Sequence, residues 1–224
     1  MKIRSSILLV WWGYIMLYEY LKKNYKENEP ILLSAIQIEG MSNVNIRQQI
    51  KKLSDNGSIK RYDTGIYFIP KKSVFKSGSQ LSLNDVIQYK YLQDETGVCG
   101  YISGIEFANQ LGLTTQVPMK KEIVTNKATK DYRETTLAQS SIIIRRPRIK
   151  ITEENYKILQ LLDLLKDIDL LAEVTGDLLN EKLFSYMKKA TLTFSDLDSY
   201  LDYYPEKIYK NLYKVGLLNG VFTS

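Results

Sequence analysis

The sequence predicts an α+β protein with an N-terminal winged helix-turn-helix, a mixed α/β middle region and a helical C-terminal region. Three observations lead to this prediction. Residues 30–70 read as helix, break, helix and hairpin, a β-branched run lies at 141–144, and apolar residues recur at helical spacing after residue 150. We therefore expect three regions, which are 1–72, 81–150 and 151–224.

The N-terminal region contains the helix-turn-helix pattern. A short apolar helix is expected at 30–36, and Gly40 breaks it within a few residues. Ser42 is a good N-cap for a second helix, which is expected to end at Asn56-Gly57. Two strands around a tight turn at Asp63-Thr64-Gly65 then complete the element order of a winged helix.

The second helix is expected to be amphipathic. Its buried stripe consists of Ile46, Ile50 and Leu53, at i, i+4 and i+7. The opposite face shows Val44, Gln48 and Lys51, flanked by Asn45, Arg47 and Lys52. Because an α-helix fits the major groove of B-DNA and a hairpin can lie along the neighbouring backbone, this cationic, amide-rich face predicts binding of double-stranded DNA.

Each side-chain type on this surface suits one kind of DNA contact. Arg47 can fork onto guanine, and Asn45 or Gln48 can pair with adenine. Lysines can neutralise phosphates, and groups at the helix start can donate hydrogen bonds to them. The candidate DNA-binding residues are Ser42, Asn43, Asn45, Arg47, Gln48, Lys51, Lys52, Lys60, Arg61 and Tyr62. The alternative is a solvated helix face, since winged helices also mediate protein contacts.

The charges of the chain are unevenly distributed. Residues 1–72 hold 12 basic and 6 acidic side chains, residues 73–150 hold 11 and 7, and residues 151–224 hold 8 and 12. The net charge of +6 favours polyanionic partners, and this distribution places the basic surface in the first two thirds of the chain.

The residue inventory excludes several classes of enzyme. The chain has no histidine and only one cysteine, Cys99, so intramolecular disulfides, Cys/His zinc sites and His-dependent triads are excluded. We also find no Gly-rich phosphate loop and no clustered carboxylates for a metal. We therefore expect a protein that is not an enzyme and has no cofactor and no metal.

An apolar run at 7–18 follows Lys2 and Arg4 and resembles the start of a signal peptide. It is shorter than the about 20 residues of a membrane span, and no small-residue cleavage motif follows it. We expect either a helix packed on the domain or an over-long start with Met16 as the initiator. The expected location is cytoplasmic, without stable membrane insertion, and a membrane-attached regulator is the weaker alternative.

The middle region is expected to follow a linker rich in Lys, Ser and Gly at 71–80. Its expected elements are a helix at 103–111 and a strand at 122–125. Thr114, Thr115 and Gln116 are interpreted as turn residues rather than as a polar site. The basic cluster Arg145-Arg146-Pro147-Arg148 either extends the DNA footprint, contacts RNA or is a solvated loop.

The C-terminal region is expected to consist of helices whose role is packing. Thr152 is predicted to cap a helix with a buried stripe of Ile158, Leu161, Leu162, Leu165 and Ile168. Further helices are expected to start at Ser195-Asp196 and at Pro205. Tyrosines in this region are assigned to the core in preference to a partner surface, and they are Tyr200, Tyr203, Tyr204, Tyr209 and Tyr213.

Two segments of the chain resemble the AbiEi-type antitoxin family. The first comprises residues 53–62, Gly65-Ile66-Tyr67 and Pro70-Lys71-Lys72, and the second comprises residues 100–104, 111–118 and Thr125-Asn126. The resemblance implies a bacterial type IV toxin–antitoxin antitoxin that represses its own operon at inverted repeats, as a possible homodimer, and counteracts a nucleotidyltransferase toxin. The alternatives are a stand-alone winged-helix regulator and a protein-interaction module without a toxin, with the acidic tail as its docking surface.

Overall fold

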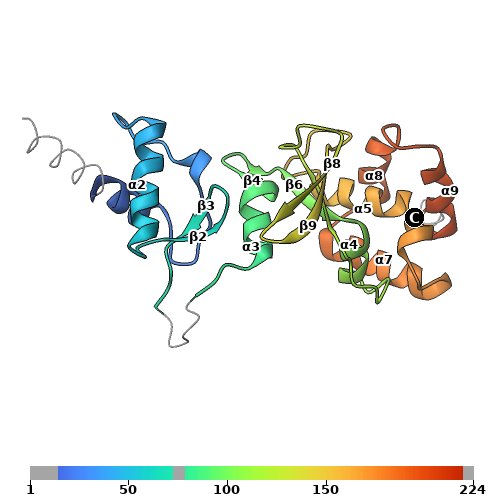
Figure 1. Ribbon diagram of the computed structural model, residues 1–224. Helices are drawn as coiled ribbons and strands as arrows, with labels where there is room; N and C mark the ends of the chain where they lie inside the picture. Colours follow the sequence, from blue (N-terminus) through green and yellow to red (C-terminus); the bar gives the residue numbers. More distant parts are fainter. Residues whose placement is uncertain (1–14, 73–78, 219–224) are drawn as a thin grey trace, which may run out of the picture. The chain divides into compact units, whose positions relative to one another are not determined.

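The chain folds as an α+β protein, as predicted (Figure 1). A computed structural model describes residues 15–72 and 79–218, so most of the apolar run and of the expected linker lies outside the described residues. The chain divides into two compact units, Met1–Lys90 and Tyr91–Ser224. The boundary expected between the middle and C-terminal regions, near residue 150, therefore lies within the second unit, whereas residues 81–90 of the expected middle region belong to the first unit.

The described part of the first unit contains three α-helices and a three-stranded antiparallel sheet in the order β1-β3-β2. Residues 15–24 are helical. The elements that follow are β1 (Ile31–Leu32), the 3-10 turn η1 (Leu33–Ala35), α2 (Asn43–Asp55), β2 (Lys60–Asp63), β3 (Ile66–Phe68) and α3 (Leu83–Ile87).

The helix predicted at 30–36 is wrong. Ile31 and Leu32 pair with Tyr67 and Ile66 of β3, and only the single turn η1 follows. The apolar run at 30–36 is compatible with a helix or with a strand. Its pairing with β3, more than 30 residues later, makes its start a strand.

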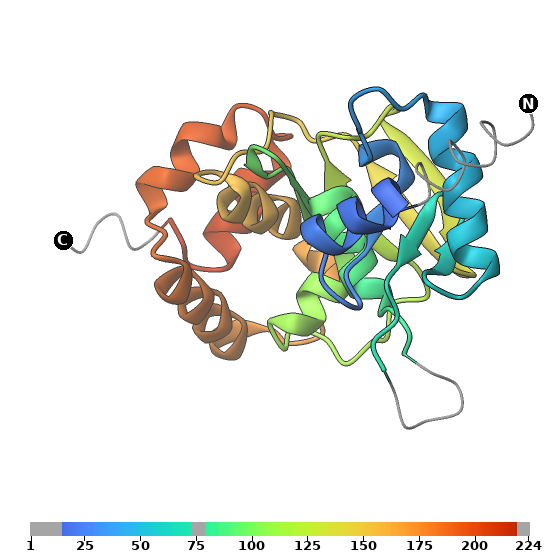
Figure 2. The ribbon, with the colours of Figure 1, turned by 90° about the vertical axis from the view of Figure 1, so that its left-hand side faces the viewer.

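A buried cluster packs the helix at 15–24, β1 and α2 of the first unit against one another. The helix at 15–24 contributes Leu17 and Leu21, and α2 contributes Ile46, Ile50 and Leu53, which confirms the predicted buried stripe. Figures 1 and 2 show α2 lying beside β2 and β3. The buried stripe fixes which face of α2 points outward.

The second unit is built on a four-stranded sheet in the order β6-β7-β9-β8, in which β7 and β9 run parallel. Its strands are β6 (Gly100–Ser103), β7 (Lys121–Thr125), β8 (Tyr132–Leu137) and β9 (Ser140–Arg145), and β4 (Gln93–Asp94) and β5 (Gly97–Val98) form a small hairpin. The π-helical turn η2 (Gln88–Leu92) precedes this hairpin. The predicted strands at 122–125 and 141–144 are confirmed as β7 and β9.

Helices make up the rest of the second unit. They are α4 (Gly104–Gln110), α5 (Tyr156–Lys166), α6 (Ile168–Leu171), α7 (Gly176–Ala190), α8 (Phe194–Leu201) and α9 (Lys207–Lys214). The predicted helices at 103–111 and after Pro205 are confirmed as α4 and α9. The cap at Thr152 is wrong, because α5 starts at Tyr156 and the backbone N–H of Thr152 donates to Asn155 Oδ1 at 2.8 Å instead.

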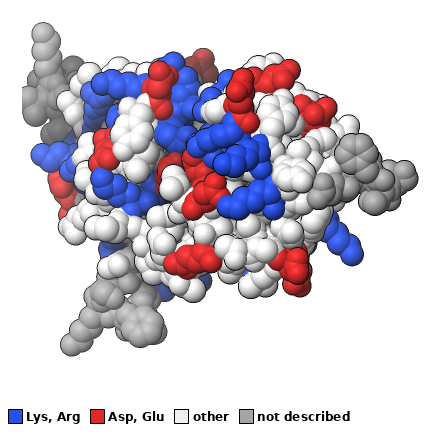
Figure 3. All heavy atoms as spheres, turned by 90° about the vertical axis from the view of Figure 1, so that its right-hand side faces the viewer, with Lys and Arg blue, Asp and Glu red and all other residues white. Residues whose placement is uncertain are grey.

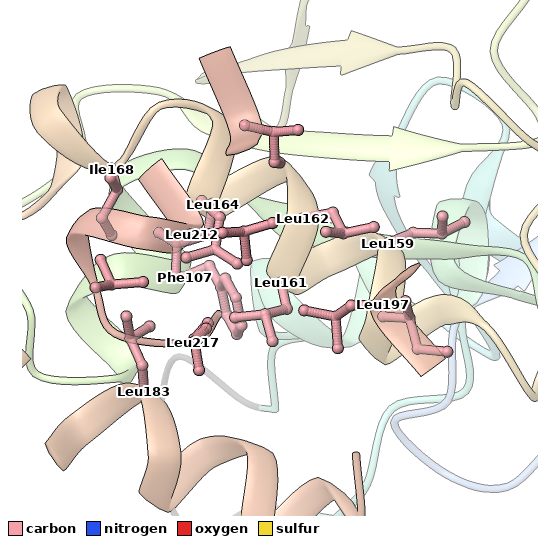
Figure 4. Packing of buried hydrophobic residues seen from close by; sticks show 14 of the residues in the cluster. Phe107, Leu159, Leu161, Leu162, Leu164, Ile168, Leu183, Leu197, Leu212 and Leu217 are labelled. Carbon is pink, nitrogen blue, oxygen red and sulfur yellow. The ribbon is translucent and has the colours of Figure 1, made fainter. Parts of the chain in front are cut away.

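Helix α5 lies at the centre of the core of the second unit (Figure 4). All five residues of the predicted stripe are buried, four of them in α5 and Ile168 in α6, and so are Leu159 and Leu164 of α5. Residues of α4, α7, α8 and α9 pack into the same cluster. The tyrosines only partly follow their predicted placement, since Tyr204 is buried but Tyr203, Tyr209 and Tyr213 are exposed.

The described helices are all too short or too polar to cross a membrane.

Candidate nucleic-acid interface

The helix α2 has well-defined ends. At its start the Ser42 Oγ accepts a hydrogen bond from the Asn45 N–H at 3.3 Å, so the predicted N-cap is confirmed. At its end the Asn56 N–H donates to the Lys52 carbonyl, and Gly57 takes a φ of +78°, which a side chain disfavours. The 13 residues between them form a rod about 20 Å long.

The structure brings most of the candidate residues together on the outward face of α2. Its cap and exposed positions are Ser42, Asn43, Asn45, Arg47, Gln48, Lys51 and Lys52. Val44 lies among them and is 62% exposed. These side chains supply hydrogen-bond donors, acceptors and positive charge over three helical turns.

Among residues 15–72 and 79–218, no carboxylate pairs with the cations of α2. Within the described part of the chain, Arg47, Lys51 and Lys52 form no ion pair. The helix also has no acidic residue in its first turn, and its only carboxylate is Asp55 at the last position. The positive charge on this face is therefore available to a polyanion.

The hairpin β2–β3 is short and tied to its surroundings. The Leu33 N–H donates to the Gly65 carbonyl at 2.9 Å, which holds the turn against η1. The Arg61 guanidinium donates to the Asp63 carbonyl at 3.3 Å and to the Thr64 Oγ1 at 3.1 Å. Arg61 therefore orders the turn of its own hairpin, although its side chain is exposed.

The other two candidates on this hairpin are less accessible. Lys60 and Tyr62 are half-buried at the start of β2. Burial, together with Asp63 and Asp85 nearby, raises the pKa of the Tyr62 hydroxyl, which keeps it a neutral donor. Both residues line a pocket with Phe68 and residues 79–81, and that pocket includes no residue of α2.

A polar groove adjoins the start of α2. It has a volume of about 460 Å³ and lies between η1, the first turns of α2 and the β2–β3 turn. Asn43 and Arg47 line it from α2, Ser34 from η1 and Thr64 from the turn. Hydroxyl, amide and guanidinium groups thus converge where a helix start has unpaired backbone N–H groups, a combination suited to a phosphate oxygen.

The basic cluster of the second unit is engaged within the protein. Arg145 pairs with Glu122 and lies 3.4 Å from Asp163. Arg146 pairs with Asp131 at 3.0 Å, and Arg148 lies over the Tyr204 ring and donates to the Tyr203 carbonyl. Arg145 is therefore held inside the second unit, whereas Arg146 and Arg148 are exposed and remain compatible with a nucleic-acid contact or a solvated loop.

The turn interpretation of Thr114, Thr115 and Gln116 is confirmed. The Thr114 Oγ1 accepts from the Gln116 N–H at 3.1 Å. The Glu173 carboxylate accepts from the Thr115 N–H at 2.7 Å and from Gln116 Nε2 at 3.2 Å. Glu173 lies more than 50 residues later, and no sequence signal connects it with this turn.

Positive charge elsewhere in the second unit is largely balanced. Lys207 and Lys214 of α9 pair with Asp167 and Asp169. Figure 3 looks onto the side of the molecule where α9 lies, and basic and acidic side chains are interleaved there.

Among the described residues there is also no group of three or more Cys, Asp or Glu side chains that could hold a metal ion.

A search of curated proteins found none that matches this chain. Residues 17–193 match a protein family described as a family of unknown function, DUF6088. The match spans the described part of the first unit and most of the second, including α2, the β2–β3 hairpin and the Thr114–Gln116 turn. The chain therefore belongs to the DUF6088 family.

Proposed function

We propose that this protein is a transcriptional regulator that binds double-stranded DNA with α2 in the major groove. The observation that carries the proposal is the outward face of α2, where amides and cations without an ion pair among the described residues cover three turns, with no carboxylate before Asp55. A rod of this length and charge suits a groove about 12 Å wide lined by phosphates. The proposal assigns no catalytic step to the chain.

The arrangement of the first unit supports this proposal. We interpret its order of helix, strand, turn, helix and hairpin as a winged helix in which η1 takes the place of the first helix of the helix-turn-helix pair. The short β2–β3 hairpin suits a contact with the DNA backbone, to which it would contribute the cations Lys60 and Arg61. The side chains of α2 would then contact the base edges.

The resemblance to AbiEi-type antitoxins extends the proposal to a biological role. We propose that the protein represses its own operon in the cytoplasm, as a dimer on inverted repeats, and counteracts a nucleotidyltransferase toxin. Co-expression with a nucleotidyltransferase encoded beside the gene tests the second part. Rescue of growth supports the antitoxin role, and undiminished toxicity leaves a stand-alone regulator.

DNA binding is tested by fluorescence anisotropy of the full chain on the duplex upstream of its gene. If several phosphates are contacted, the affinity falls steeply between about 50 and 200 mM salt. The paired substitution Lys51→Gln with Lys52→Gln removes two expected phosphate contacts. We expect it to lower the affinity by about tenfold to hundredfold at 0.1 M salt and to reduce the salt slope by about 2.

The chain offers a matched control for this variant. Lys188 and Lys189 are also adjacent, exposed lysines on a helix, α7. Lys188→Gln with Lys189→Gln makes the same change in net charge and is expected to leave the affinity nearly unchanged. Equal losses in the two paired variants would show that net charge, and not the α2 surface, governs binding.

A second candidate function is a protein-interaction module, which the exposed tyrosines of the C-terminal helices favour. Tyr209 and Tyr213 lie one turn apart on α9, and Tyr203 precedes that helix. Exposed tyrosines are common at protein interfaces. Tyr209→Ala with Tyr213→Ala tests this candidate better than truncation after Lys150, since α5 completes the core of the second unit. Partner capture that survives this variant removes the candidate.

A further inference from the structure

Val44 is an apolar side chain in a polar surface. It lies in the first turn of α2 and is 62% exposed, whereas the other large apolar residues of this helix are buried. A β-branched residue is also a poor helix former, so neither packing nor helix propensity accounts for it here. Its position suggests a contact that the isolated chain does not make.

The neighbours of Val44 define what that contact can be. Arg47 and Gln48 follow it by three and four residues and lie on the same side of the helix, and Lys51 continues this row. All three are exposed and polar. An occupant of this face must therefore combine hydrogen-bonding groups and negative charge with an apolar group opposite Val44.

The major groove of DNA meets this description at one base. The thymine C5-methyl is the distinctive apolar group among the base edges exposed there, and it is recognised by apolar side chains. In helix-turn-helix proteins the first residues of the recognition helix contact base edges. Val44 occupies such a position, immediately after Asn43 and the Ser42 cap.

We propose that Val44 contacts a thymine methyl group and makes thymine a preferred base in the DNA site; this inference rests on the proposed DNA binding. Gln48 lies about 6 Å further along the helix axis and is suited to adenine. Successive bases are about 3.4 Å apart along the duplex axis. The thymine read by Val44 therefore lies one or two base steps from the adenine read by Gln48.

Uracil provides the test, because it differs from thymine only by the missing methyl group. Duplexes that the full-length protein prefers are first selected from a random pool. Each thymine of the selected duplex is then replaced by uracil in turn. We expect the wild-type protein to lose about fourfold in affinity at one thymine, or at its symmetric pair, as expected for one buried methyl group.

The variant Val44→Ala loses two methyl groups and should show a smaller difference between the thymine and uracil duplexes at that position than the wild type, whereas Gln48→Ala should keep the wild-type preference for thymine. Val117→Ala is the matched control, since Val117 is an exposed valine of the second unit. It should behave as the wild type. Alanine is a better helix former than valine, so Val44→Ala is expected to keep α2 folded, which thermal unfolding checks.

Two failures are distinguishable. If the protein selects a duplex but no uracil replacement weakens it, or if Val44→Ala keeps the wild-type sensitivity, the assignment of Val44 is overturned and DNA binding stands. If no duplex is enriched and binding shows no salt dependence, the proposed function is overturned and the assignment with it.

Discussion

Arg47 and Lys60 have the same charge but different settings in the first unit. Arg47 lies on the outward face of α2 beside Asn43 in the polar groove, where its planar guanidinium can reach a guanine edge. Lys60 is half-buried at the start of β2, and its flexible ammonium suits a phosphate. The two side chains are therefore expected to have different roles in binding.

We expect Arg47→Ala to weaken the preferred duplex by about 1 to 3 kcal/mol and to relax the base preference at one position. Lys60→Ala should weaken preferred and random duplexes alike. Affinities of both variants for both duplexes check this. Equal losses on the two duplexes for Arg47→Ala would contradict its role in base readout.

Arg145, unlike Arg47 and Lys60, is a cation whose partners are carboxylates of the protein itself. Its guanidinium pairs with Glu122 and approaches Asp163, whose side chain is only 4% exposed and also accepts from the Tyr101 hydroxyl at 3.0 Å. Burial raises the pKa of Tyr101 well above its ordinary value, and Asp163 adds to this effect, so this hydroxyl remains a donor. The group lies within the second unit.

Arg145→Ala is expected to destabilise the second unit by roughly 3 to 5 kcal/mol, because it leaves a buried carboxylate without its cation. Adding Asp163→Asn should restore part of this loss, since the buried charge is then removed. Denaturant-induced unfolding, monitored by hydrogen exchange of the α5 amides, measures the free energy of unfolding of both variants. A stable Arg145→Ala protein with weakened DNA binding would contradict the structural role.

At the scale of elements, the turn at 114–116 depends on a carboxylate from another segment. The hydrogen bond from the Thr115 N–H, helped by the side chains of Thr114 and Gln116, lowers the pKa of Glu173 below its ordinary value of 4.5. A lowered pKa in the folded state means that the stabilisation is fully present above pH 4.5 and is lost as the pH falls through the folded value.

The hydrogen-exchange protection factor of the Thr115 amide should therefore stay constant from about pH 7 to 5 and decrease below about pH 4. Glu173→Gln should give a lower protection factor without this pH dependence, because its amide does not titrate in this range. A wild-type profile that stays flat through pH 3 would contradict the role of the Glu173 carboxylate.

The elements that the sequence predicts well are those whose determinants are local. The Ser42 cap, the buried stripe and Asn56-Gly57 all lie within 16 residues, and α2 forms where they predict it. The prediction of a helix at 30–36 was wrong because β1 pairs with β3. The role of Glu173 was missed because its partners lie far away in the chain. The candidate site on α2 was predictable for the same local reason, whereas the partners of Arg145 were not.

At the scale of the whole molecule, the charge surplus belongs to one unit. The sequence of Met1–Lys90 contains 14 basic and 7 acidic residues, and that of Tyr91–Ser224 contains 17 and 18. The sequence predicted a basic surface in the first two thirds of the chain. The division into units shows instead a basic first unit and a nearly neutral second unit. This distribution supports the proposal that the first unit meets the DNA.

The two units also have separate buried clusters, which allows DNA binding to be assigned to one of them. Leu53 belongs to the first cluster and Leu162 to the second, and both are fully buried. Replacing either by alanine should cost about 2 to 5 kcal/mol and increase hydrogen exchange mainly in its own unit. The amides of α2 report on the first variant and those of α5 on the second.

A ligand that binds only the folded form stabilises it, by about 2.7 kcal/mol at a concentration 100 times its Kd. The preferred duplex at this concentration should therefore slow exchange in α2 of Leu53→Ala about 100-fold. The same excess should leave exchange in α5 of Leu162→Ala nearly unchanged, because the proposed contacts lie on the first unit. Equal slowing in both units would mean that the second unit also contacts DNA, and a duplex with no effect on α2 would contradict the proposed interface.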